Sequence, residues 1–441
     1  MIAVPGGELL RAPLFHTPRN PFRDSSALEC YEDGGLLVIE GRVAGCGDYA
    51  SLRKAHPEIP TVDLRGGFLL PGFVDTHIHF PQLRVLGDLG HSLLDWLEHC
   101  ALPEEARMAD HSHACRIARG FVQALVSHGT TTASVFGAHF APATAALFEA
   151  AEAAGLRIAA GQVLSDRGLL PELHQTPDRA YRESGLLIER FHRHGRSLYS
   201  VTPRFALSAS EAMLEVCQTL LREHQGLLLQ THLNENLEEI AEVARMFPWA
   251  PDYLAVYERF GLNRPGAVMA HNVHPTQSEM DRLAGGGASI AHCPSSNAAL
   301  GSGLFALKRH ISAGVRCALG TDVGGGTGFG MLKEGLQAYL LQRIAPDGML
   351  LDAGHLLYLA TLAGAEALSL GEETGDFRVG KSADFVYLRP PADSVLAAVL
   401  EREQSPKQAL AAIFTLAGSE SVREVRVAGS MVYRSAVAGE P

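Results

Sequence analysis

The middle of the chain alternates short apolar runs with longer stretches whose apolar residues recur at helical spacing. This alternation is typical of parallel βα units, in which each strand is followed by a helix that covers the sheet. Eight runs qualify as strands: FLLPGFVDTH (68–77), TTTASVFGA (130–138), RIAAGQVLSD (157–166), SLYSVTPRF (197–205), GLLLQTH (226–232), GAVMAH (266–271), ASIAH (288–292) and VRCALGTD (315–322). Eight such units predict a TIM-like (β/α)8 barrel. An open doubly wound sheet is disfavoured, because no glycine-rich dinucleotide fingerprint follows any of the runs.

Both ends of the chain show the alternation of polar and apolar residues that is typical of strands. GGLLVIEGRVAGCGDY (34–49) predicts two short strands around a glycine turn, and ADFVYL (383–388) and VREVRVAGSMVYR (422–434) show similar patterns. We therefore expect an α/β protein in which a small β-sandwich domain, formed by both chain ends, flanks the barrel. The sandwich is expected to comprise residues 1–67 and 377–441, and the barrel residues 68–376.

Composition narrows the class of protein. The 441 residues are 46% hydrophobic and 20% charged, as in an ordinary soluble globular protein. The net charge of −12 comes without a basic stripe, which argues against a nucleic-acid partner. No secretory signal pattern opens the chain, and no apolar run approaches the roughly 18 residues of a membrane span. The seven scattered cysteines form no Cys-x-x-Cys, which favours reduced thiols in a cytoplasmic protein.

Residues that bind metals in proteins recur where the apolar runs end. The first run leads into His77 and His79, the fifth ends in His232, the sixth in His271 and the eighth in Asp322. Active sites of (β/α)8 barrels lie at the carboxyl ends of the strands, so these side chains are expected to converge. Alone, His232 or His271 would more often be a packed core histidine, and Asp322 could be a helix cap.

The chain contains three His-x-His pairs, and secondary structure separates them. Residues two apart in a strand point to one side, so His77 and His79 can share an ion. HSH (111–113) and HRH (192–194) belong to helical patterns, where residues two apart diverge. We expect those two pairs to be solvated surface histidines. His292, at the end of the seventh run, is interpreted as a packing residue.

Three imidazoles and one carboxylate are a usual set of ligands for catalytic Zn²⁺ with a position left for water, although Fe²⁺ or Mn²⁺ could occupy it. One ion is expected, because the fourth run has no lysine to bridge two. Hydrolysis also needs a proton acceptor and a proton donor. Asp322 could accept the water proton, and Glu235, three residues after His232, is the candidate proton shuttle. Its alternative role is a first-turn glutamate favoured by the helix dipole, which Glu238 and Glu239 fit better.

These motifs resemble the amidohydrolase superfamily and, within it, the guanine deaminases. The resemblance covers most of the chain, including the return segment GDFRVGKSADFVYL (375–388) after the barrel. The motifs on which the resemblance rests are, in chain order, PGFVDTHIHFPQ, TPRF, THLNEN, MAH, ASIAHCPSSN and LGTDVGGG. The motifs typical of guanine deaminases are shorter: Gln82 in HFPQ, LLDWLEHCALPEEARM (93–108) and TPRF.

The resemblance implies a metal-dependent, hydrolytic conversion of guanine to xanthine and ammonia. It also implies that the protein is a homodimer and that its ligand is a small-molecule purine. Zinc would be bound by His77, His79, His232 and Asp322. His271 would orient the attacking water, and Glu235 would shuttle protons to the purine. The implied purine contacts are Gln82, Trp96, Arg204 and Phe205, together with His232, Glu235, His271 and Asp322.

Physical chemistry fits the implied pocket. Arg204 could donate to the purine O6, Gln82 could pair with a ring-edge donor and acceptor, and Phe205 could supply an apolar face. The alternatives are a salt bridge for Arg204 and a core position for Phe205. Another aminopurine, a pterin or a triazine remains a possible substrate of the same machinery. A non-catalytic barrel that only binds a ligand would predict gaps among these residues, and the sequence has none.

Overall fold

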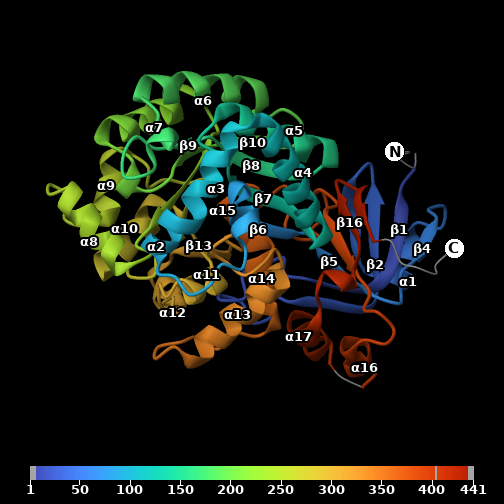
Figure 1. Ribbon diagram of the computed structural model, residues 1–441. Helices are drawn as coiled ribbons and strands as arrows, with labels where there is room; N and C mark the ends of the chain where they lie inside the picture. Colours follow the sequence, from blue (N-terminus) through green and yellow to red (C-terminus); the bar gives the residue numbers. More distant parts are fainter. Residues whose placement is uncertain (1–5, 403–404, 436–441) are drawn as a thin grey trace.

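Eight parallel strands form a barrel at the centre of the molecule (Figure 1). The structure is a computed structural model that describes residues 6–402 and 405–435. The barrel strands lie side by side in the order of the sequence: β6 (Phe73–His79), β7 (Thr130–Phe136), β8 (Arg157–Gly161), β10 (Ser197–Pro203), β11 (Leu228–Leu233), β12 (Ala267–His271), β13 (Ser289–His292) and β14 (Arg316–Leu319). The two-residue strand β9 (Val163–Leu164) also pairs with β10. This arrangement confirms the predicted TIM-like barrel.

Hydrogen bonds between the first strand and the segment after the last strand close the barrel. The backbone N–H of His79 donates to the carbonyl of Val323, and that of Asp322 donates to the carbonyl of His77, both at 2.8 Å. The hydroxyl of Thr76 donates to the carbonyl of Leu319, also at 2.8 Å. Two regions of the chain that carry candidate metal ligands are therefore joined directly.

Helices surround the barrel in Figure 1 and bury their apolar stripes against it. Helix α4 is an example: Asp110 caps its amino end by accepting from the backbone N–H groups of Ser112 and His113, and Ile117, Phe121 and Leu125 are buried at helical spacing. The longer helices are α4 (His111–Ser127), α5 (Ala141–Ala154), α6 (Pro177–Phe191), α7 (Glu211–Glu223), α8 (Leu237–Met246), α10 (Gln277–Gly286), α13 (Met331–Ile344) and α17 (Pro406–Leu416). The shorter ones are α1 (Tyr49–Ala55), α2 (Leu93–Trp96), α3 (Leu102–Ala106), α9 (Tyr253–Arg259), α11 (Pro294–Ala299), α12 (Leu307–Ala313), α14 (Ala353–Ala360), α15 (Leu362–Ala367) and α16 (Val395–Leu400). Every helix of the described residues is too short or too polar to cross a membrane.

A second sheet combines strands from both ends of the chain, as the alternation of polar and apolar residues there predicts (Figure 1). In this sheet, β1 pairs in parallel with β4 and β5, and all the other strand pairs of the sheet are antiparallel. The order is β17 (Ser430–Arg434), β16 (Val422–Val427), β15 (Phe385–Leu388), β5 (Phe68–Pro71), β1 (Glu8–His16), β2 (Glu29–Ile39) and β3 (Arg42–Asp48), with β4 (Thr61–Asp63) beside β1.

The first predicted barrel strand, 68–77, is divided between the two sheets. Residues Phe68–Pro71 form β5 of the end sheet, and the barrel strand begins only at Phe73. Gly72 makes the crossing, where a Cβ atom would lie 2.2 Å from the side chain of Thr131. Only glycine allows so close an approach, so the chain passes between the two sheets within one residue.

Residues 93–106, which we call the cover segment, lie beside the carboxyl end of the barrel. The segment consists of α2, one turn of π-helix at Leu97–Ala101, and α3. π-Helical turns are frequent at functional sites, where they change the direction in which neighbouring side chains point. Here the segment presents Leu93, Trp96 and Leu97 to the cavity described below.

Candidate active site

The predicted metal ligands converge at the carboxyl end of the barrel, where all four are buried. The imidazole Nε2 atoms of His77 and His79 are 3.2 Å apart, and His79 Nε2 is 3.3 Å from His232 Nε2. Asp322 Oδ1 lies 3.2 Å from His77 Nε2 and 3.3 Å from His79 Nε2. Ligands about 2.0–2.1 Å from a tetrahedral zinc ion are separated by roughly 3.3 Å, so the donor atoms fit one such ion.

The protonation states also suit a cation. Burial lowers the pKa of His79 to about 4, and it lowers the pKa values of His77 and His232 as well. These imidazoles are therefore neutral at pH 7 and keep a lone pair. Burial alone would raise the pKa of Asp322, but its contacts with His77 and His79 hold that pKa well below its usual range. Neutral imidazoles and an ionised carboxylate are the forms that bind metal.

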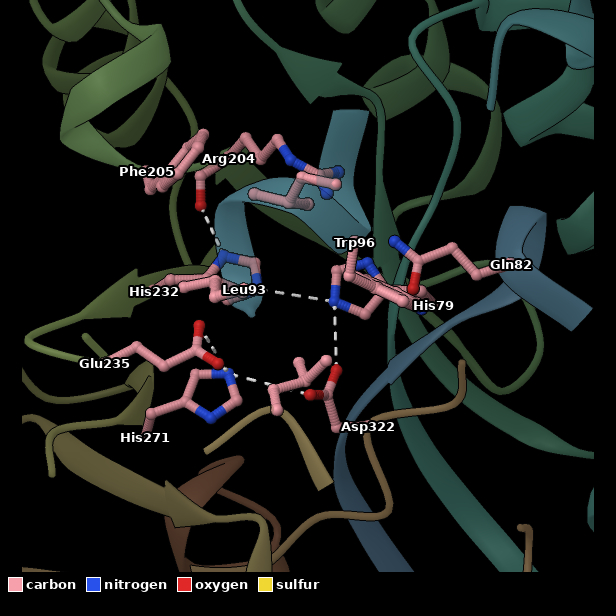
Figure 2. Close-up of a pocket in the computed structure, with 12 residues that line it drawn as sticks. His79, Gln82, Leu93, Trp96, Arg204, Phe205, His232, Glu235, His271 and Asp322 are labelled. Atoms are coloured by element: carbon pink, nitrogen blue, oxygen red, sulfur yellow. Dashed lines mark hydrogen bonds and ion pairs between the residues drawn. The ribbon is translucent and has the colours of Figure 1, made fainter. Parts of the chain in front are cut away.

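Hydrogen bonds on the far side of the rings fix their orientation. His232 Nδ1 lies 2.6 Å from the carbonyl oxygen of Arg204, so Nδ1 is the donor and Nε2 faces the other ligands (Figure 2). His271 Nδ1 lies 2.9 Å from Oδ1 of Asn297 in α11, and its Nε2 has no hydrogen-bond partner among the described residues. A buried ring nitrogen without a partner, aimed at the site, is available to a ligand or water.

The backbone is strained where it presents these groups. His271 and Asp322 have φ values of 71° and 49°, a region that residues other than glycine rarely adopt. Their neighbours Asn272 and Asn234 share this conformation, with φ values of 45° and 49°. Such residues cluster at functional sites, where the surrounding structure holds them in place.

Glu235 lies beside His271, at the turn between β11 and α8. Its Oε2 is 3.5 Å from His271 Nε2, and its Oε1 accepts a hydrogen bond of 3.3 Å from the Ser302 hydroxyl. Burial, with the charge of Asp322 in second place, raises the pKa of Glu235 to about 8. The carboxyl group is therefore protonated at neutral pH and able to donate that proton, as the predicted shuttle requires.

A cavity of about 350 Å³, counted with its open mouth, adjoins the metal ligands. In Figure 2, Glu235 and His271 lie on one side of His232, and Arg204 and Phe205 lie on the other. Every purine-contact residue expected from the sequence lines it. The lining comprises His79, Gln82, Leu93, Trp96, Leu97, Arg204, Phe205, His232, Glu235, His271, Leu300 and Asp322.

Sequence reasoning missed Glu105, which organises one wall of this cavity. Arg204 Nη1 donates to both carboxylate oxygens of Glu105, at 2.7 and 2.9 Å, and Gln82 Nε2 donates to Oε1 at 2.7 Å. The salt bridge considered as an alternative role for Arg204 therefore exists, and Arg204 lines the cavity as well. The one signal in the sequence is spacing, since Leu97, Ala101 and Glu105 follow one another at intervals of four residues.

The other histidine pairs lie away from the site, but one of their four members is not at the surface. His111 and His194 are exposed, and His192 is half-buried. His113 is buried on α4, where Arg116 Nη2 lies 2.7 Å from its Nδ1, so the expectation of a surface histidine is wrong there. Its position four residues before Ile117 puts it on the buried face of the helix.

Two further residues clarify which side chains belong to the site. His292 stacks on Phe305 with ring centroids 4.3 Å apart, which agrees with its interpretation as a packing residue. Ligand atoms of Cys293, His77 and His271 also lie within 4.8 Å of one another. Burial raises the pKa of Cys293 well above its usual range, which keeps it a thiol and a poor metal ligand. His77 therefore forms a better metal site with His79, His232 and Asp322 than with His271 and Cys293.

Comparison with known proteins places this site in context. The model of the Amidohydrolase family matches residues 68–432. The probable guanine deaminase of Deinococcus radiodurans is 54% identical to this chain, over 97% of this chain and 98% of the relative. Two solved guanine deaminases have similar structures. That of E. coli is 39% identical with a TM-score of 0.93, over 97% of this chain and 99% of the other. That of Bradyrhizobium japonicum is 33% identical with a TM-score of 0.92, over 98% and 100%.

Proposed function

The chain belongs to the amidohydrolase family and, within it, to the guanine deaminases, and from this premise we propose that it hydrolyses guanine to xanthine and ammonia in the cavity described above. The observation that carries the proposal is the combination of two groups at one cavity: a metal-binding set beside a protonated Glu235, and an Arg204–Gln82 wall suited to a polar ring edge.

The family is metal-dependent, and we propose that one Zn²⁺ is held by His77, His79, His232 and Asp322. The spacing of their donor atoms and their mixed nitrogen and oxygen chemistry support zinc. When bound, such an ion supplies a water molecule whose pKa is lowered towards 7.

The protein groups around guanine divide the proton transfers between them. Asp322 accepts a proton from the attacking water as its oxygen forms a bond to C2 of guanine. Glu235 gives its proton to the adjacent ring nitrogen, N3, which relieves the charge that develops on the ring. His271, through Nε2, hydrogen-bonds to the oxygen that attacks. The proton held by Asp322 passes to the exocyclic amine, which leaves as ammonia, and loss of the remaining hydroxyl proton to Glu235 completes xanthine.

The purine itself is held by the cavity wall. Arg204 and Gln82 offer polar atoms to its O6 and N1 edge, and Phe205 and Trp96 offer apolar faces. Arg204 is a donor only, which favours the carbonyl oxygen of guanine over the amino group of adenine. This donor set supports a 6-oxopurine over a 6-aminopurine.

We further propose that the protein is a cytoplasmic homodimer. All seven cysteines are free thiols, as expected in a reducing compartment. Leu340, Ile344 and Leu350, in and after α13, are large apolar side chains that are 46%, 70% and 69% exposed, which suits a contact with a second subunit. Sedimentation of the purified protein as a monomer would contradict the dimer.

The deciding experiment incubates the purified, zinc-loaded protein with guanine and follows ammonia and xanthine together with metal content. We expect one ammonia for each xanthine formed, and loss of turnover when the metal is removed by a chelator. Turnover of adenine, a pterin or a triazine without turnover of guanine would contradict the proposed substrate.

A further inference from the structure

Glu105 is buried beneath the wall of the cavity and does not line it. It lies in α3, is 2% exposed, and its carboxylate binds two cavity-lining side chains from different regions of the barrel. Gln82 follows strand β6, and Arg204 follows strand β10. Burial would raise the pKa of Glu105, but the Arg204 guanidinium, the neighbouring histidines and the hydrogen bond from Gln82 together lower that pKa, so the group remains a carboxylate.

These contacts determine which polar atoms remain for a ligand. Arg204 uses Nη1 on Glu105, while its Nε and Nη2 have no hydrogen-bond partner within residues 6–402 and 405–435. Gln82 is held at both ends of its amide: Nε2 donates to Glu105 at 2.7 Å, and Oε1 accepts from the backbone N–H of Gly324 at 3.1 Å. The amide therefore cannot turn over, and it offers one N–H and one lone pair in fixed places.

A buried ion pair is a costly way to fill space. Removing two charges from water is unfavourable, and apolar residues of similar volume often stabilise a protein as well or better. His139 also faces this carboxylate, with its Nδ1 3.4 Å from Oε2, and burial lowers the pKa of His139 to about 4, so it brings no second positive charge. The distinctive effect of Glu105 is thus to orient the guanidinium of Arg204 and the amide of Gln82 at the cavity.

The cover segment links this polar wall to the apolar faces of the cavity. Trp96 and Leu97 line the cavity from the same helical segment that carries Glu105. The anchor that orients Arg204 and Gln82 therefore also ties this segment to the barrel.

We infer that Glu105 is a positioning residue that sets the preference of the cavity for 6-oxopurines, by aiming the free donors of Arg204 and the fixed amide of Gln82 at the O6 and N1 edge of the ring. This inference rests on the proposed function, since it presumes that a purine occupies the cavity. Glu105 acts through its two neighbours and does not touch the reacting atoms.

Binding of two bases that cannot be deaminated tests the inference. Hypoxanthine carries O6 and the N1 proton, whereas purine lacks both, and neither has the 2-amino group that hydrolysis removes. Calorimetry with the zinc-loaded protein gives the ratio of their dissociation constants. In Glu105→Gln, an amide N–H must face the donors of Arg204 or Gln82, and we expect the advantage of hypoxanthine to fall about 10- to 100-fold.

Matched variants separate positioning from general damage. Glu98→Gln makes the same change at an exposed position of the same segment and should leave the ratio unchanged. Glu105→Asp keeps the charge and should recover some of the ratio. In an Arg204→Gln background, adding Glu105→Gln should change the ratio by a smaller factor than in the parent protein, because one of the two groups through which Glu105 acts is gone.

The outcomes distinguish this inference from the proposed function. If the protein binds neither base nor guanine, the proposed function fails and the inference falls with it. If it binds both bases and Glu105→Gln leaves their ratio unchanged, only the role of Glu105 is overturned. An undiminished effect in the Arg204→Gln background overturns it too. If Glu105→Gln does not fold, Glu105→Asp is compared with the parent protein: a smaller fall in the ratio supports the inference, and an unchanged ratio overturns it.

Discussion

The metal side and the purine side of the cavity are built in different ways. His77, His79 and His232 belong to barrel strands, and Asp322 lies just beyond the last strand, which ends at Leu319, so the barrel itself sets their spacing. On the purine side, Gln82 and Arg204 lie beyond the strands and are held by Glu105 of the cover segment. The barrel therefore positions the proposed metal ligands, whereas the cover segment positions the residues that are proposed to select the purine ring.

The largest expected effect comes from the metal side. His79→Ala removes the histidine whose Nε2 faces three other candidate ligands. We expect the purified variant to contain little metal and to lose activity by about 10⁴-fold or more, since activation of water is lost with the ion. Metal analysis and ammonia release on the same sample check this. Retention of stoichiometric metal would show that the ligand set is assigned wrongly.

Glu235→Gln should separate proton transfer from metal binding. The variant keeps the shape of the side chain but has no acidic proton, and general acid–base groups contribute about 10²- to 10⁴-fold to rate. We expect kcat to fall by that factor while metal content and guanine affinity stay near those of the parent protein. Activity near the parent value would exclude Glu235 as the shuttle.

Arg204→Gln tests the purine side with a smaller expected effect. Loss of a charged donor to a carbonyl oxygen should weaken guanine binding about 10- to 100-fold. Metal content should not change, because the Arg204 side chain is bonded to Glu105 and not to the metal ligands. A variant that loses metal as well would show that the two sides are not independent.

The smallest expected effect is the change in activity per pH unit. The pKa of Glu235 is raised to about 8, and the protonated form is the donor, so activity should fall as pH rises through about 8. The fall approaches tenfold per pH unit well above this value. A profile of kcat between pH 6 and 10 checks it, and Glu235→Gln should lack this limb. A rise in the parent activity above pH 8 would contradict the assigned proton donor.

The same contrast explains what the sequence could predict. Strand-end positions could be read from short apolar runs, because a strand fixes the side to which alternate residues point. Glu105 could not, since its partners lie 23 and 99 residues away along the chain and meet it only in the folded barrel. The burial of His113 could have been read from its place four residues before Ile117, but the polar character of the pair obscured it.

Local pattern also failed where one apolar run serves two sheets. Residues 68–77 have a single apolar pattern, and nothing in it marks the change of partner at Gly72. The change depends on the side chain of Thr131, which approaches too closely for a Cβ atom. Such a boundary is set by packing between segments that are distant in sequence.

The closure of the barrel between its first and last strands has a consequence for the order in which the protein can be completed during synthesis. Thr76 meets the carbonyl of Leu319, 243 positions later, and β5, which immediately precedes the first barrel strand, pairs with β15, which comes later still. The His77–His79 pair leaves the ribosome with the first strand of the barrel, but Asp322 joins it only after most of the chain has been made. Because long-range parallel pairing is slow and a metal site is seldom preformed in an unfolded chain, we expect the ion to be acquired late, as the ring closes.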